Sequence, residues 1–259
     1  MSETRRAPER VVVVGGTAGI GLTTARRLLA TGTRGLALFG RSPERGEAAR
    51  DRLSADFPEV HVTFIRCDAG EAEATERAMA QAARSLGGID ALVSSAGGDV
   101  LPKLLKDIPT AEVMSVIGAI AGCVIVPARA VYPVMKAQGT GAIVCFASDA
   151  CKVATPGESL VGAAMAAIAM FCRGMAIEAK RDGVRVNCIT PSIVRGTPLY
   201  DRLQEDEFSR RLFAKAEQMA SLGVATADDI ANLACFLVSD EAARLTGQTI
   251  SVTGGISAA

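Results

Sequence analysis

The stretch VVVVGGTAGIG (residues 11–21) decides the fold of this chain. Four β-branched residues in a row, Val11–Val14, are typical of a buried strand, and a helical pattern follows the glycines at once. Gly15 allows a tight turn, Gly19 lets the backbone approach a pyrophosphate, and Gly21 permits close packing of helix on sheet. Free N–H groups at the helix start favour phosphate. The stretch predicts a dinucleotide-binding turn; the alternative is a tight turn that holds no ligand.

Further along the chain, short β-branched runs alternate with longer helical patterns, which indicates a parallel sheet covered on both faces. Strands are expected at residues 10–14, 35–39, 60–65, 89–94, 141–147, 184–189 and 248–252, and helices near 20–31, 43–55, 71–86, 110–137, 159–182 and 226–238. Right-handed crossovers make this a doubly wound, Rossmann-like α/β fold with a seven-stranded parallel sheet, forming a single domain over residues 1–259. The stretch 190–222 has no expected strand; we expect it to be helical over Glu205–Ser221 and to cover the substrate crevice as an insertion.

Composition excludes several classes of protein. The 28 Lys and Arg residues balance the 28 Asp and Glu residues, so no net positive field attracts nucleic acid or a membrane surface. The longest apolar stretches, near 116–128 and 160–172, fall short of the ~18 uninterrupted residues of a membrane span. The seven cysteines form no C-x-x-C pair, and the first ten residues show no secretory signal. We therefore expect a cytoplasmic protein with a small-molecule substrate, no metal, and no nucleic-acid or membrane partner.

The end of the second expected strand bears on the cofactor. It reads Phe39-Gly40-Arg41-Ser42, without the Asp or Glu that usually bonds the ribose hydroxyls of NAD(H). Arg41 can instead pair with a 2′-phosphate, which favours NADP(H). The alternative is an arginine that is simply solvated at the surface.

The G-x-x-x-G-x-G spacing of residues 15–21 resembles that of the short-chain dehydrogenase/reductase family, and further landmarks follow in order over nearly the whole chain. They are Asp68, Ser94-Ser95-Ala96-Gly97 in place of Asn-Asn-Ala-Gly, Asn187–Pro191, Thr246-Gly247-Gln248 and Gly254-Gly255. The resemblance implies NADP held by Gly15, Thr17, Gly19, Ile20, Gly21, Arg41, Ser42, Asp68, Ala69, Ser95, Ala96, Gly97, Pro191 and Ile193. It also implies a homo-oligomer, a dimer or tetramer, in which the helices near 110–137 and 159–182 pair across a twofold axis.

The resemblance does not extend to the catalytic tetrad of Asn, Ser, Tyr and Lys. Ser148 falls on the family serine, but Val161 stands at the tyrosine position thirteen residues later. Met165 stands at the lysine position, and Ile120 at the asparagine position. The one Tyr-x-x-x-Lys of the sequence, Tyr132 to Lys136, lies before the segment 141–178 that aligns with the family pattern. Since Val, Met and Ile cannot exchange protons, the usual proton relay is absent.

Other side chains can supply a proton near the crevice. Asp149 directly follows Ser148, so these two residues are the catalytic candidates. Further loop residues that should border the substrate are Asp99, Lys152, Glu158, Arg195 and Tyr200; for each, the alternative is a solvated loop side chain. The single histidine, His61, lies at the third expected strand and is expected to be structural.

Three functions fit these observations. The first is an atypical NADP(H)-dependent oxidoreductase that reduces a small, cyclic or activated carbonyl, quinone or imine acceptor without the Tyr–Lys relay. The second is a catalytically inactive nucleotide-binding member, acting as a sensor or structural subunit. The third is a non-redox cyclase, dehydratase or isomerase that uses the apolar cleft to shape its substrate.

Overall fold

A computed structural model describes residues 7–97 and 100–258 of the chain. Within them, seven parallel strands form one sheet in the order β3-β2-β1-β4-β5-β6-β7. The strands are β1 (Arg10–Val14), β2 (Gly35–Gly40), β3 (His61–Arg66), β4 (Ala91–Ser94), β5 (Gly141–Phe146), β6 (Val184–Pro191) and β7 (Thr249–Val252). This confirms the single-domain α/β fold, and each expected strand is present with its ends moved by at most two residues.

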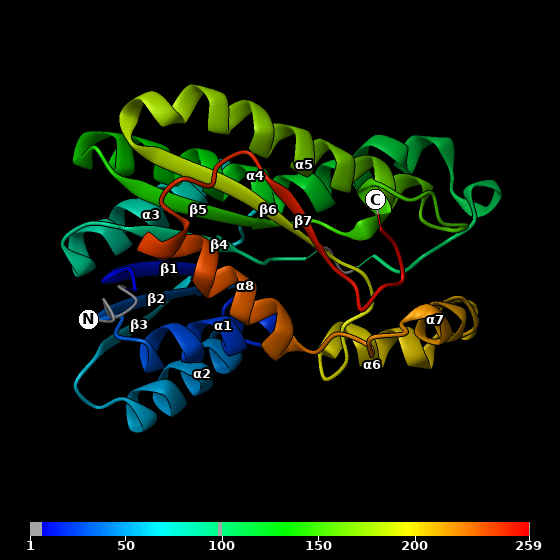
Figure 1. The fold of residues 1–259 in the computed structure, drawn as a ribbon, viewed down its shortest axis with the longest axis horizontal. Helices are drawn as coiled ribbons and strands as arrows, with labels where there is room; N and C mark the ends of the chain where they lie inside the picture. Colours follow the sequence, from blue (N-terminus) through cyan, green and yellow to red (C-terminus); the bar gives the residue numbers. More distant parts are fainter. Residues whose placement is uncertain (1–6, 98–99, 259) are drawn as a thin grey trace.

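Helices cover both faces of the sheet (Figure 1). One face carries α1 (Gly19–Ala30), α2 (Pro43–Asp56) and α8 (Ala227–Val238), and the other carries α3 (Ala72–Leu86), α4 (Val113–Gln138) and α5 (Ser159–Ala179). The valines of β1 alternate between the two cores, as the period of a strand requires. Val11 and Val13 pack on the side of α1 and α8, whereas Val12 and Val14 pack on the side of α3, α4 and α5.

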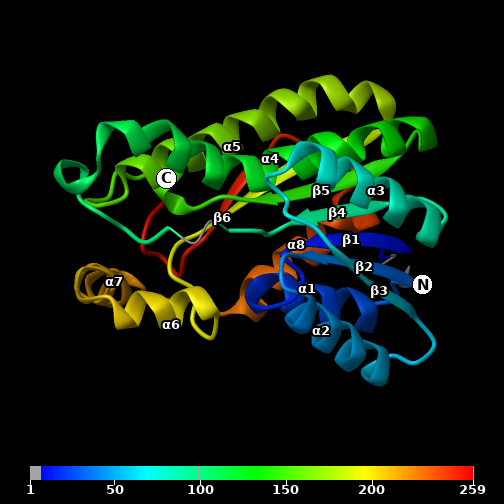
Figure 2. The same ribbon diagram turned by 180° about the vertical axis from the view of Figure 1, so that it is seen from behind.

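Residues 190–222 differ from the expectation of one helix over 205–221. They form two helices, α6 (Pro198–Glu205) and α7 (Glu207–Met219), which project beyond the carboxyl end of the sheet (Figures 1 and 2). The missed start signal of α6 is Thr197 followed by Pro198, where the Thr197 hydroxyl accepts from the Tyr200 N–H at 3.2 Å. The segment thus lies at the end of the sheet where a cover over the substrate crevice is expected. Its role as a substrate cover stays a prediction.

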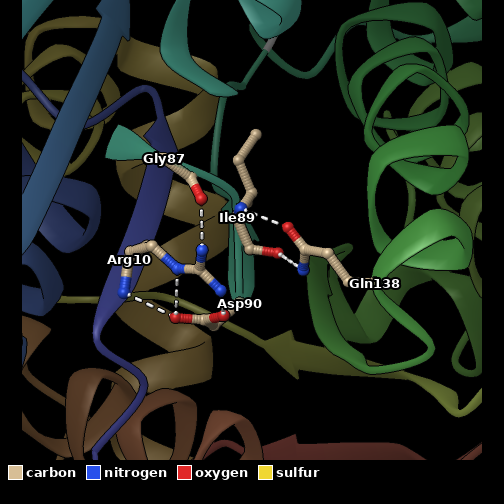
Figure 3. Close-up of polar contacts among 5 residues, drawn as sticks. All are labelled: Arg10, Gly87, Ile89, Asp90 and Gln138. Atoms are coloured by element: carbon tan, nitrogen blue, oxygen red, sulfur yellow. Dashed lines mark hydrogen bonds and ion pairs between the residues drawn. The ribbon is translucent and has the colours of Figure 1, made fainter. Parts of the chain in front are cut away.

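A polar cluster fastens the amino end of the sheet (Figure 3). Arg10 donates from its backbone N and its Nε to Asp90 Oδ2 at 2.9 and 3.0 Å, and its guanidinium also donates to the Gly87 carbonyl. The side-chain amide of Gln138 accepts from Ile89 N and donates to Ile89 O, both at 2.8 Å. These charge-assisted and paired bonds tie β1, β4 and the end of α4 together, opposite the carboxyl end that carries the candidate site.

Two helices on one face are unusually apolar. The segments Thr110–Gln138 and Ser159–Asp182 are long and apolar enough to cross a membrane, by length and composition alone. The uninterrupted apolar stretches of the sequence are shorter than these two segments, because single polar or charged residues interrupt each run. One face of each helix packs on the rest of the fold: α4 packs between α3 and α5, and α5 packs on β6. Only 28% and 33% of the two apolar windows are buried.

Candidate functional site

The glycine turn after β1 has no room for side chains. A Cβ atom at Gly15, where φ is 75°, would lie 2.8 Å from Ala96 N, and one at Gly21 would lie 2.2 Å from Gly15 O. The Ser95 hydroxyl closes the turn by donating to Val14 O at 2.9 Å. No side chain caps the start of α1 in the described structure, so its first N–H groups face the crevice uncapped. This geometry suits a pyrophosphate bound against the backbone.

The adjoining strands β2 and β3 end beside this turn. Thr17 packs against Gly40, since a Cβ atom at Gly40 would lie 2.9 Å from Thr17 Cγ2. Arg41 follows Gly40 directly and is exposed. The Ser42 hydroxyl accepts from Arg45 N at 3.3 Å and thereby caps α2. Asp68 is exposed after β3 and accepts from Gly70 N at 3.1 Å, while the neighbouring Ala69 is buried. The structure thus brings the expected adenosine-side residues to one edge of the sheet.

The remaining expected cofactor residues follow β4 and β6. Ser95, Ala96 and Gly97 come directly after β4, and Pro191 ends β6. Asp99, one of the candidate proton donors, lies outside the described residues. Ile193 is 2% exposed and packs in an apolar cluster with Leu203 and Phe213 of α6 and α7. Only the backbone of Ile193, and not its side chain, is therefore left to contact a cofactor.

Ser148 and Asp149 follow β5 at the same edge. The Ser148 hydroxyl is half-buried and accepts from Ala150 N at 3.3 Å, which leaves its hydrogen to be donated to a ligand. Asp149 is only 6% exposed, and its Oδ1 atom is buried with no hydrogen-bond partner in the described part of the chain. An unsatisfied buried acceptor of this kind is rare and requires an explanation.

Val161 and Met165 lie one helical turn apart near the start of α5, and both are half-buried against the core. Val161 lines a cavity of about 150 Å³ whose walls are mostly apolar. The lining residues are Val100, Leu101, Lys103, Ile108, Glu112, Val116, Gly157, Leu160 and Val161. Ile120 is 2% exposed in the core and is not among them. Sequence reasoning missed most of this lining; the apolar residues of 100–108 after β4 were the available signal.

The insertion contacts the wall of this cavity. A Cβ atom at Gly157 would lie 2.6 Å from Phe208 Cε1, so α7 packs directly on the loop that precedes α5. Lys103 N donates to Gly157 O at 2.8 Å, which joins the loop after β4 to the same place. Leu101 packs against the apolar cluster of α6 and α7. Two segments, 100–116 and 157–161, therefore line the cavity, and α7 packs on the second of them.

Most of the other candidate proton donors are held by partners. Lys152 Nζ donates to Thr249 O at 3.2 Å and to Ser251 Oγ at 2.8 Å, so it is directed at β7. Glu217 accepts from Arg195 and from the Tyr200 hydroxyl, each at 2.9 Å. That bond to Glu217 raises the pKa of Tyr200, which makes the phenol a weaker acid.

Two further findings concern Glu158 and His61. Burial raises the pKa of Glu158, and the nearby Asp149 charge adds to this. His61 is exposed on the edge strand β3, where its Nε2 lies 3.0 Å from Ser85 Oγ, so it has no place at the crevice. Among the residues that the structure describes, no group of three or more His, Cys, Asp or Glu residues is arranged to hold a metal ion.

Comparison with known proteins shows relatives that span nearly the whole chain. Residues 15–257 match the family model described as Enoyl-(Acyl carrier protein) reductase. The chain is 32% identical over 248 residues to the short-chain reductase protein NovJ of Streptomyces niveus, covering 94% of this chain and 92% of that protein. It is 29% identical over 255 residues to dehydrogenase/reductase SDR family member 4 of Oryctolagus cuniculus, covering 97% of this chain and 96% of that protein. The chain is also similar to a solved, NADPH-bound structure of a short-chain oxidoreductase from Pseudomonas aeruginosa PAO1, which is described as containing an atypical catalytic center. The two superpose with a TM-score of 0.87 at 29% identity, covering 97% of this chain and 98% of that one.

Proposed function

Because this chain belongs to the short-chain dehydrogenase/reductase family, we propose that it is an NADP(H)-dependent oxidoreductase that works without the family's tyrosine and lysine. Its acceptor is a small, cyclic or activated carbonyl, quinone or imine. The observation that carries the proposal is the mostly apolar cavity with Val161 in its wall, at the same sheet edge as the glycine turn. A similar protein with an atypical catalytic center binds NADPH, which supports the same reading for this chain.

The residues of the turn fit such a cofactor. The absence of room for a Cβ atom at Gly15 and Gly21 leaves the backbone itself as the surface that would hold the pyrophosphate. Arg41, with Ser42, would hold the 2′-phosphate, because a guanidinium pairs well with phosphate oxygens. When bound, NADPH supplies a hydride. The residues after β4 and β6 would then place the nicotinamide beside Ser148.

The acceptor class follows from the missing acid. Val161 has no proton to give, and a general acid contributes about 10²–10⁴-fold to rate, so unactivated ketones should react slowly. Ser148 can still orient a carbonyl oxygen by donating its hydroxyl hydrogen. The cavity volume, about 150 Å³, suits a six-membered ring, because an engineered apolar cavity of about 150 Å³ binds benzene.

An acceptor panel tests this function. The wild-type protein should consume NADPH with quinones and cyclic imines, and only slowly with simple ketones, as followed by the loss of NADPH absorbance. Tight NADPH binding with no turnover on any acceptor would instead identify an inactive nucleotide-binding member. Conversion of a candidate substrate without NADPH would identify a non-redox enzyme.

We also propose that the chain forms a homo-oligomer through α4 and α5. Met114 of α4 and Met170 and Ile177 of α5 are 72%, 63% and 62% exposed, and an apolar surface of this kind usually marks an interface. Light scattering should give a multiple of the 26.7 kDa chain mass, and Met170→Glu with Ile177→Glu should lower it. A wild-type monomer at micromolar concentration would contradict the proposal. Exposed Glu76→Gln on α3 is the control and should leave the mass unchanged.

A further inference from the structure

The mostly apolar cavity has two charged residues in its lining, Lys103 and Glu112. Both are exposed, whereas every other lining residue is half-buried or buried. The most exposed part of the lining is where the cavity opens to solvent, so Lys103 and Glu112 mark this opening. The apolar part of a ligand therefore lies inside, and any charged part stays at these two residues, because an unpaired charge is costly among apolar walls.

The backbone holds both charged residues in place. Lys103 N donates to Gly157 O at 2.8 Å, which fixes Lys103 against the other lining segment. Glu112 directly precedes α4; its N donates to Pro109 O at 2.9 Å, and its O accepts from Ser115 Oγ at 2.9 Å. Each charged side chain thus begins at a fixed backbone position in the lining of the cavity.

Neither charge is paired within the part of the chain that the structure describes. No hydrogen bond or ion pair there joins the Lys103 ammonium group or the Glu112 carboxylate to another residue, and the two are not paired with each other. Elsewhere the chain does pair exposed charges, as in the ion pair of Arg77 with Glu73 on α3. The two charges at the opening are therefore available to a ligand.

One positive and one negative group at the same opening select the charge of a ligand. A ligand with a single charge is attracted by one of the two groups and repelled by the other, so it gains little affinity. A neutral ligand gains from neither group. A ligand with both charges can pair each of them with its opposite. The opening is therefore complementary to a zwitterion.

We propose that the acceptor is a zwitterion of the amino-acid type, whose carboxylate binds Lys103, whose ammonium group binds Glu112, and whose uncharged ring fills the cavity. The proposal rests on the oxidoreductase function proposed above and names its substrate class. The reducible bond belongs to the ring, at the end that meets Val161 in the other lining segment. Lys103 and Glu112 thus determine specificity and take no part in the chemical step.

The first test measures binding and needs no turnover. Calorimetric titrations of the protein, with and without NADPH, compare four compounds that share a cyclohexyl ring and accept no hydride: cyclohexylglycine, cyclohexylacetate, cyclohexylmethylammonium and cyclohexylmethanol. Cyclohexylglycine should bind about fivefold or more tightly than each of the others, since one exposed ion pair contributes up to about fivefold. The difference should shrink in high salt. Equal affinity for cyclohexylglycine and cyclohexylmethanol would overturn the proposal.

Two neutral variants should give opposite changes that a disturbed fold would not give. Lys103→Met should weaken the binding of cyclohexylglycine by about two- to fivefold and tighten that of cyclohexylmethylammonium, because it removes an attraction and a repulsion. Glu112→Gln should likewise weaken cyclohexylglycine, but tighten cyclohexylacetate. The controls Lys106→Met and Asp107→Asn change exposed residues outside the lining and should leave all four affinities unchanged. An equal loss of affinity for charged and neutral compounds in both variants would refute the assignment.

The second test is kinetic and separates this proposal from the function on which it rests. An amino-acid head group is added to the best neutral ring acceptor of the wild type, at the position furthest from the reducible bond. It should lower KM by about fivefold or more with kcat unchanged, and Lys103→Met or Glu112→Gln should raise that KM again. An unchanged KM would overturn the zwitterion proposal and leave the oxidoreductase function intact. Absence of NADPH consumption with every acceptor would overturn the proposed function, and the acceptor role of the zwitterion with it.

Discussion

Replacing Val161 by Tyr together with Met165 by Lys is expected to raise the rate of reduction of a simple ketone by about 10²-fold or more, since a general acid contributes about 10²–10⁴-fold. The two positions lie one turn apart on α5, so a lysine at 165 can lower the pKa of a phenol at 161. The cavity beside Val161 offers space for the ring. The rate of NADPH consumption with the ketone is the measurement.

The matched control for this gain is Val161→Phe with Met165→Lys. It adds the same ring and the same amine without the hydroxyl, and it should leave ketone reduction at the wild-type rate. An equal gain in the phenylalanine variant would show that filling the cavity, and not the phenol, had raised the rate. Fast ketone reduction by the wild type would show that the protein already has an efficient acid.

The second large effect is expected at Arg41. The wild type should bind NADPH at least tenfold more tightly than NADH, because a hydrogen bond to a charged group is worth about 1.5–3 kcal/mol. Arg41→Ala should remove most of this difference in affinity, because it should weaken the binding of NADPH and not that of NADH. Calorimetric titration with both cofactors measures it, and the preference should fall with added salt, because Arg41 is exposed at the end of β2.

Arg34→Ala is the control for this experiment. Arg34 is an exposed arginine directly before β2, at the opposite end of the strand, where it lies 3.7 Å from Glu9. Its removal should leave the ratio of the two affinities unchanged. Equal affinity of the wild-type protein for NADPH and NADH would refute the role given to Arg41 and leave the fold and family untouched.

The two predictions separate the two halves of the site. The proposed cofactor half consists of the backbone at the glycine turn, which has no room for a Cβ atom at Gly15 and Gly21, and of Arg41. The proposed acceptor half has Val161 and Met165 where the resemblance to the family implies tyrosine and lysine, and its cavity is mostly apolar. A protein with this combination should bind its cofactor normally and be selective for acceptors that need little help from an acid.

Much of the fold was predictable from the sequence, for a local reason. A strand such as Val11–Val14 and a turn such as residues 15–21 are specified by side-chain branching and by glycines within a few residues of each other. The sequence also suffices to show that Val161 and Met165 cannot donate a proton, because no environment turns an aliphatic side chain or a thioether into a proton donor. The start signal of helix α6, Thr197 followed by Pro198, is also local, so the sequence contained the information needed to predict this helix.

Only the tertiary structure decided the environment of each candidate. The sequence presented Asp149 as a catalytic candidate and Lys152, Glu158 and Tyr200 as loop residues near the substrate. The structure shows that Asp149 is buried, that Lys152 bonds to β7, that Glu158 has its pKa raised by burial and that Tyr200 bonds to Glu217. Phe208 and Gly157 lie 51 positions apart in the chain and meet only when α7 packs on the loop before α5. Burial and charge act through space between such distant segments, so the acidity of a side chain follows from the packing around it and not from its neighbours in sequence.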